Sequence, residues 1–158
     1  MTEIQRIVDQ LNRAFEGGAW HGPAVMEILE GITPQLAATR PSNTLHSIWE
    51  ITLHIAAWAR AGQRRLLGDR AQLSDAEDWP KVPEANDETW NQTVELVRQA
   101  YKQLGDAISK LPESRLEEPI LEGTSSVYVT LHGVIQHSLY HAGQIALLKK
   151  IGLEQEGV

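Results

Sequence analysis

The chain has 158 residues, about one domain, and a formal net charge of −7 from 14 Lys and Arg against 21 Asp and Glu. This balance argues against nucleic-acid or anionic-membrane binding, because phosphates repel a net-acidic surface. The absence of cysteine excludes disulfides, thiolate metal ligands and a cysteine nucleophile. The sequence shows neither a signal-peptide-like start nor an apolar run of the ~18 residues that a membrane span needs. We therefore expect one soluble, cytoplasmic domain over residues 1–158.

The N-terminal segment is predicted to form a short amphipathic helix that ends before the glycines at 17 and 18. Its apolar residues recur at helical spacing: Ile4, Ile7, Leu11 and Phe15. Residues 19–41 are predicted to form short helical pieces, and Thr33 followed by Pro34 is typical of an N-cap and the first helical position.

Proline placement then leaves three blocks that can each hold a long helix, because proline inside a helix removes a hydrogen bond and clashes with the preceding turn. These blocks are 42–79, 84–111 and 120–158. In the first block the candidate caps are Ser42, Asn43 and Thr44, and the apolar stripe is Ile48, Ile51, Ile55 and Trp58. This stripe continues through Gly62 to Leu66, and Gly68 ends the helix.

The other two blocks carry similar stripes. The stripe of 84–111 comprises Trp90, Val94, Val97, Tyr101, Leu104, Ile108 and Leu111, with Asn86 or Asp87 as N-cap and Pro112 as the stop. The stripe of the last block comprises Val134, His137, His141, Ile145 and Leu148, with Thr130 as N-cap and residues 127–129 possible in an extended form. Residues 69–85 and 112–129 are predicted connections. Four amphipathic helices favour an all-α fold, a four-helix bundle.

Two of the six histidines lie inside an apolar stripe. His137 and His141 stand one above the other on the helix face that must contact other helices, and this spacing lets both reach one metal ion. A hydrogen-bonded histidine pair in the core is the alternative. His132 faces the opposite side, where we expect a solvated residue or a contact at the helix end.

A third ligand is available on the second long helix. His54 lies at the edge of the apolar stripe, and three neutral imidazoles on a divalent cation leave positions open for water or substrate. Glu50 and Gln144 are candidates to orient the ligands through hydrogen bonds. The alternative is that Glu50 is solvated and Gln144 is bonded within the bundle.

The remaining histidines and the tryptophans carry weaker signals. His46 is predicted to have a surface or capping role, and His21 is predicted to lie in a turn or to line a pocket. Four tryptophans are expected to anchor the core, its rim or an interface: Trp49, Trp58, Trp79 and Trp90. Trp58, one turn after His54, is the one predicted to border the histidine site.

Together these motifs resemble the DinB/YfiT-like family. The resemblance rests on LHSIWE at 45–50 leading to LHI at 53–55, and on HSLYHAGQI at 137–145. WHGP at 20–23 is similar to one subgroup. The resemblance implies an up-down-down-up bundle with a long crossover between the second and third helices, near Pro80 and Pro83. It also implies zinc or nickel held by three histidines, His54, His137 and His141, in a protein that often forms a homodimer.

Three functions follow as hypotheses. The resemblance implies thiol-dependent S-transferases and isomerases, so the first is a metal-dependent transferase that joins a low-molecular-weight thiol to a small electrophile. Because the chain has no cysteine, the sulfur must come from that cosubstrate. The second is a metal-dependent hydrolase with Glu50 as the base. The third is a non-catalytic, stress-related bundle in which the metal ion holds two helices together.

Overall fold

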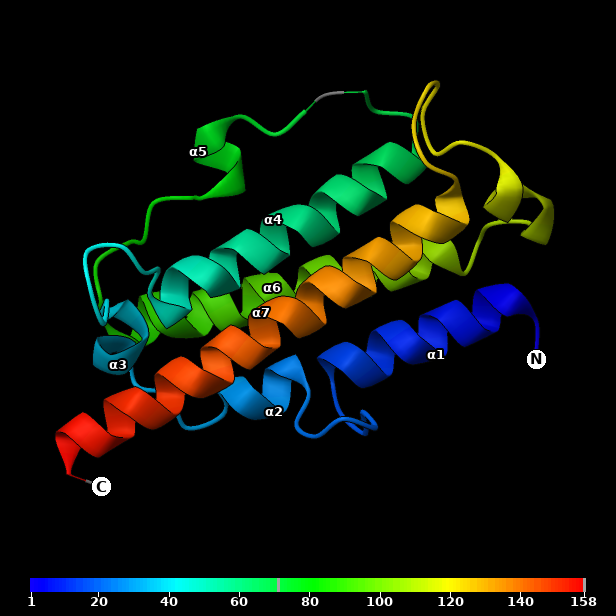
Figure 1. The fold of residues 1–158 in the computed structure, drawn as a ribbon. Coiled ribbons are helices and arrows are strands. Elements are labelled where there is room, and N and C mark those ends of the chain that lie inside the picture. Colours follow the sequence, from blue (N-terminus) through cyan, green and yellow to red (C-terminus); the bar gives the residue numbers. More distant parts are fainter. Residues whose placement is uncertain (71, 158) are drawn as a thin grey trace.

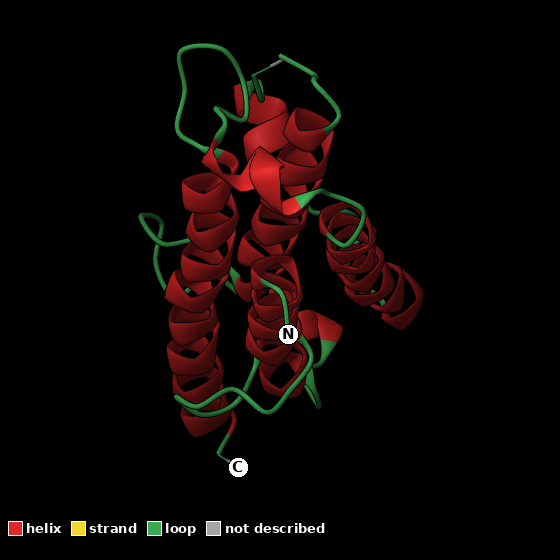
Figure 2. Ribbon diagram, turned by 90° about the vertical axis from the view of Figure 1, so that its right-hand side faces the viewer, coloured by secondary structure: helices red, strands yellow, loops and turns green. Residues whose placement is uncertain are grey.

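The prediction of an all-helical protein is confirmed by a computed structural model, which describes residues 1–70 and 72–157 (Figure 1). In these residues the elements are α1 (Glu3–Phe15), α2 (Val25–Leu29), α3 (Pro34–Ala38), α4 (Ile48–Leu66), α5 (Asp75–Asp78), α6 (Asp87–Ile108), the 3₁₀ helix η1 (Glu113–Glu117) and α7 (Val127–Glu156). Figure 2, turned by 90°, shows helices and loops but no strand in the described part of the chain. None of the described helices is long and apolar enough to cross a membrane.

The four longest helices, α1, α4, α6 and α7, lie alongside one another. α4 packs on both α6 and α7, and α1 packs on the other side of the same two helices. In Figure 1, α4 and α6 run from left to right, whereas α1 and α7 run from right to left. The connection that carries α5 returns along the length of α4 before α6 begins. This connection therefore passes over the surface of α4.

Two predicted helix starts were wrong. α4 begins after Ser47, whose hydroxyl accepts from the backbone N–H of Glu50 while Glu50 accepts from the N–H of Ser47. This reciprocal capping box satisfies two backbone donors at once, which the expected cap at 42–44 does not offer. α7 begins after Ser126, which caps the N–H of Val129, so residues 127–129 are helical and Thr130 lies inside the first turn.

Other local predictions are confirmed. Asn86 caps α6 and Thr33 caps α3, with Pro34 at the first helical position. The predicted connections hold the short α5 and η1, so they are not structureless.

Two tryptophans are buried in the core with their polar atoms satisfied. The indole N–H of Trp49 donates to the hydroxyl of Thr93 at 2.9 Å, and that of Trp90 donates to the carbonyl of Ile32 at 2.9 Å. Their rings meet edge to face at 5.0 Å between centroids. Trp49 thus joins α4 to α6 at the end of the bundle where α4 begins.

Tyr101 joins three helices close to the histidines of α7. Its ring stacks on Phe15 of α1 at 3.9 Å between centroids, and its hydroxyl hydrogen-bonds Ser138 of α7. Ser138 in turn donates to the carbonyl of Val134 at 2.8 Å. Burial raises the pKa of Tyr101 to about 12, so the phenol stays protonated and donates to Ser138. Because Ser138 follows His137, this bond fixes the rotation of α7.

We predict that Ser138→Ala costs more stability than Tyr101→Phe. Ser138→Ala leaves the buried phenol without an acceptor, at a cost of about 2 kcal/mol, whereas Tyr101→Phe leaves Ser138 still bonded to Val134 and costs about 1 kcal/mol. Urea denaturation of both variants and of the double variant measures the difference. Equal or reversed costs would contradict the arrangement.

Candidate metal centre

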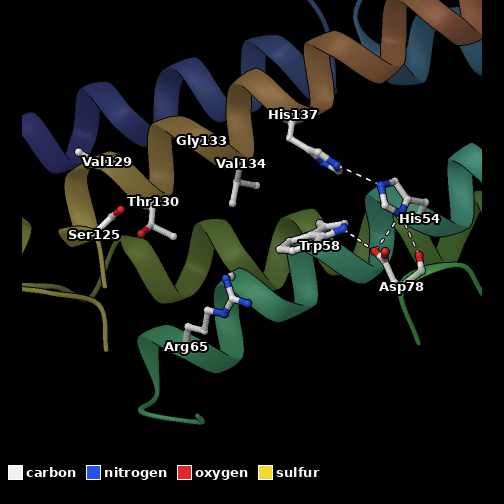
Figure 3. A pocket seen from close by; sticks show the side chains of 11 residues that line it. His54, Trp58, Arg65, Asp78, Ser125, Val129, Thr130, Gly133, Val134 and His137 are labelled. Atoms are coloured by element: carbon white, nitrogen blue, oxygen red, sulfur yellow. Dashed lines mark hydrogen bonds and ion pairs between the residues drawn. The ribbon is translucent and has the colours of Figure 1, made fainter. Parts of the chain in front are cut away.

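Three histidines from two helices meet in the interior. His54 comes from α4, and His137 and His141 come from α7; one ring nitrogen of each lies within 4.8 Å of those of the other two. The Nε2 atoms of His54 and His137 are 3.1 Å apart (Figure 3). His54 and His141 are buried and His137 is half-buried. The structure thus brings together the three residues that the sequence singled out.

Close packing of α4 on α7 makes this meeting possible. Gly62 of α4 faces α7, and a Cβ atom there would lie 3.3 Å from Cγ2 of Val134. Glycine therefore lets the two helices approach more closely than a larger residue would allow. His137 and His141 then project from successive turns of α7 toward His54.

The tautomers of two histidines are fixed by acceptors outside the cluster. Nδ1 of His54 lies 2.8 Å from the carbonyl oxygen of Asp78 and 3.1 Å from its carboxylate. Nδ1 of His141 lies 2.6 Å from Oε1 of Gln144. Because these oxygens only accept, each Nδ1 carries the hydrogen and each Nε2 presents a lone pair. Both rings are therefore in the tautomer that binds a metal through Nε2.

The geometry of the cluster is compatible with a divalent metal ion. Zinc–imidazole bonds are about 2.0–2.1 Å long, so two nitrogens on one ion lie at most about 4.2 Å apart. The 3.1 Å between His54 and His137 satisfies this limit, and the 4.8 Å bound on the whole cluster exceeds it only slightly. Two nitrogens this close repel each other unless a proton or a cation lies between them. Nδ1 of His137 is buried without a partner among the described residues, so its own protein contacts do not fix its tautomer.

The electrostatics favour the neutral form of the two histidines on α7. Burial, together with charge repulsion from the nearby His141 and His54, lowers the pKa of His137 to about 4. Burial also lowers the pKa of His141, although its hydrogen bond to Gln144 acts in the opposite direction. Neutral imidazole is the form that binds metals, so these two ligands need lose no proton at pH 7.

The connection between α4 and α6 supplies further residues at the site. Asp78 accepts from the indole N–H of Trp58 at 2.7 Å as well as from His54. Trp79 stacks on His54 at 3.9 Å between centroids and on His46 at 3.6 Å, both within 7° of parallel. These contacts hold the connection against α4 and fix the ring plane of His54.

A cavity of about 430 Å³ opens beside the histidines, between α4 and α7 (Figure 3). Its lining comprises His54, Trp58, Gly62, Arg65, Asp78, Ser125, Val129, Thr130, Gly133, Val134 and His137. Cavities of this size hold small organic ligands. The histidine cluster therefore borders a space that a substrate can occupy.

The structure does not bring Glu50 to the cluster. Its carboxylate accepts from Nε of Arg40 at 2.9 Å and from the backbone N–H of Ser47 at 2.8 Å. Burial raises the pKa of Glu50, but the bonds from Arg40 and Ser47 outweigh it and lower the pKa. The side chain is committed to capping α4 and to this ion pair. His46, predicted at the surface or in a cap, lies 3.8 Å from Glu50 and half exposed.

His21 and His132 also lie elsewhere. His21 is exposed in a turn and borders a different hollow with Trp20 and α1. His132 is half-buried against Tyr128, with 4.4 Å between ring centroids. Of the other candidates, Gln144 bonds His141, and Trp58 lines the cavity.

Sequence reasoning missed Asp78, Trp79 and Arg65 as residues of the site. They come from the connection and from the far end of α4, and no spacing rule relates a connection to the helix that it crosses. The one available signal was the pair Asp78 and Trp79 directly before Pro80 in a segment recognised as the crossover.

Comparison with known proteins assigns the family. A model of the DinB superfamily matches residues 9–145, most of the chain. The chain belongs to the DinB superfamily. The crystal structure of a conserved protein from Enterococcus faecalis matches with a TM-score of 0.76 at 16% identity, over 98% of this chain and 99% of that one. At this identity the likeness shows the fold alone. A search of curated proteins gave no match. The resemblance noted from the motifs is thus confirmed.

We predict that acid destabilises the protein when a chelator is present. Because burial lowers the pKa of His137 from 6.5 to about 4 in the folded state, the unfolded chain takes up this proton first. The free energy of unfolding should therefore fall as the pH drops through this range. Urea denaturation at pH 7 and pH 5 measures the fall, which should be smaller in His137→Gln. An equal fall in that variant would contradict the assignment.

Proposed function

We propose that this DinB superfamily protein is a divalent-metal-dependent enzyme whose ion, zinc or nickel, is held by His54, His137 and His141. The observation that carries the proposal is the meeting of three ring nitrogens within 4.8 Å beside a cavity. Three nitrogen ligands leave coordination positions open, which is the arrangement of catalytic sites; structural sites are closed by four ligands.

The residues of the chain have separable tasks in this proposal. The three imidazoles bind the ion, and Asp78 and Gln144 orient His54 and His141 through their Nδ1 atoms. Trp79 and Trp58 shield the rings from water. A divalent cation at this place lowers the pKa of a bound thiol or water.

The reaction that we propose joins the sulfur of a low-molecular-weight thiol to a small electrophilic molecule. It joins the sulfur to the electrophilic carbon, releases the leaving group with its electron pair and passes the thiol proton to solvent. Support comes from the chain itself, which has no cysteine to act as nucleophile. One oxygen of the Asp78 carboxylate, Oδ1, is already engaged by Trp58 and His54, which weakens it as the base that a hydrolase would need.

Hydrolysis is the second candidate, and one observation favours it. Asp78 places a carboxylate in the lining of the cavity, where a base could take a proton from water. In this candidate the base is Asp78, because Glu50 is bound to Arg40 and Ser47.

We also propose that the chain forms an up-down-down-up four-helix bundle. Support comes from the directions of α1, α4, α6 and α7 in Figure 1 and from the long connection between α4 and α6. The homodimer stays a prediction that light scattering can measure.

We predict one tightly bound divalent ion per chain and its loss on His137→Ala. Removing one of three ligands should weaken zinc binding by more than about 100-fold, because loss of an orienting partner alone costs 10–100-fold. The matched control is His132→Ala, which removes a histidine of the same helix and should retain the metal. Elemental analysis and competition with a chelator measure both. A wild-type protein without metal affinity would contradict the proposal.

We predict that the metal-loaded protein accelerates conjugation of a cellular thiol to a model electrophile. Asp78→Asn keeps the backbone carbonyl that accepts from His54. At saturating metal, the transferase activity of this variant should therefore fall by less than about 10-fold. If the protein is instead a hydrolase with Asp78 as base, the rate of ester hydrolysis should fall by about 10²–10⁴-fold in the same variant. Stopped-flow assays of both reactions decide between them. Metal that raises the melting temperature without turnover of either kind would instead favour a structural role.

A further inference from the structure

The cavity beside the histidines is elongated and has two chemically different ends. His54 and Arg65 both line it from α4, eleven residues apart and about 20° apart around the helix. On α7, Thr130 and His137 lie seven residues apart, which is about 10 Å along the axis. Figure 3 shows the histidines at one end and Arg65 with Ser125 at the other. A ligand that fills the cavity therefore reaches both ends.

The guanidinium of Arg65 is a positive charge that the described residues leave unpaired. It lies 5.5 Å from the centroid of the Trp58 ring, and within residues 1–70 and 72–157 no carboxylate or carbonyl bonds it. Two nearby arginines, in contrast, form ion pairs: Arg64 with Asp69 at 2.7 Å and Arg70 with Glu122 at 3.0 Å. In a chain with a net charge of −7, an unpaired arginine in a cavity points to an anionic ligand.

Ser125 adds a second donor at the same end. Its hydroxyl lines the cavity and bonds no group in the described part of the chain. The hydroxyl of Thr130 is committed to the carbonyl of Ser126 at 3.0 Å. Arg65 and Ser125 are therefore the two groups free to donate to a ligand there.

The middle of the cavity is apolar and is kept open by a glycine. Trp58, Val129 and Val134 form the walls, and Gly133 on α7 lines the cavity with nothing within 4 Å of where its Cβ would be. Glycine in a helix interior costs about 1 kcal/mol relative to alanine. At Gly133 this cost leaves space for a ligand, since no packed neighbour requires it.

We propose that the substrate of this site is an elongated small molecule with an apolar middle and a carboxylate or phosphate end. Arg65 and Ser125 bind the acidic end, at the end of the cavity away from the histidines. The reacting end lies at the proposed metal centre, so this inference rests on the proposed function. The acidic end fixes the position of the molecule in the cavity and selects against neutral analogues.

Direct binding of matched probes tests this without requiring turnover. Calorimetry on the metal-loaded and the chelated protein compares 4-phenylbutyrate with its neutral amide and with 3-phenylpropyl phosphate. We expect the wild type to prefer one or both acids over the amide by at least about 10-fold, because charge-assisted bonds to arginine are the stronger ones. Which acid binds more tightly tells whether carboxylate or phosphate is the natural group.

Three variants test which residues cause the preference for the acids. Arg65→Met should abolish the preference for the acid, whereas Arg64→Met, the matched control on the same turn, should retain it. Gly133→Leu should weaken acid and amide alike by more than about 10-fold, while the metal content stays unchanged and the melting temperature does not fall. Equal binding of acid and amide to the wild type, a preference that survives in Arg65→Met, or no binding of any probe would overturn the proposal.

The outcome is separable from that of the proposed function. Acid preference in a protein without metal affinity or turnover would support the anion subsite and reject the metalloenzyme. Metal binding and turnover without acid preference would reject the subsite alone.

Discussion

Burial of three imidazoles at one point is the constraint on which the site depends. A ring taken out of water needs partners for its nitrogens, and a buried polar group without one costs several kcal/mol. Asp78 and Gln144 satisfy the outward nitrogens of His54 and His141. The inward nitrogens face one another, so a positive charge shared among them stabilises the whole cluster. Burial and the neighbouring histidines lower the pKa of His137, which keeps its ring in the neutral form that can bind a metal ion.

The connection between α4 and α6 serves both the fold and the chemistry. It must run back along α4 for α6 to begin at the same end, and this route carries it past His54 (Figure 1). Asp78 and Trp79 then orient and cover that histidine. The asymmetry of the cavity has a similar origin, because α4 and α7 run in opposite directions. The end of α4 with Arg65 therefore meets the start of α7, which Ser125 directly precedes, at one end of the cavity.

Much of this could be predicted from the sequence, for identifiable reasons. Helical periodicity found the four long helices and placed His137 and His141 on the inward face, because that spacing is a local property. The predicted starts of two helices were wrong because more than one residue could serve as the cap. Tertiary packing decides that the caps are Ser47 and Ser126. Contacts across a connection were out of reach, so Asp78 was missed and Glu50 was given a role that Arg40 and Ser47 prevent.

The central claim is that these imidazoles hold one divalent ion, and X-ray absorption spectroscopy of the zinc-loaded protein tests it most directly. The expected spectrum shows about three imidazole nitrogens at about 2.0–2.1 Å, with the remaining position filled by an exchangeable water oxygen. In His54→Ala the number of imidazoles should drop by one. A spectrum of oxygen ligands only, or one identical in wild type and variant, would mean that the ion binds elsewhere and that the cluster is a hydrogen-bonded feature of the core.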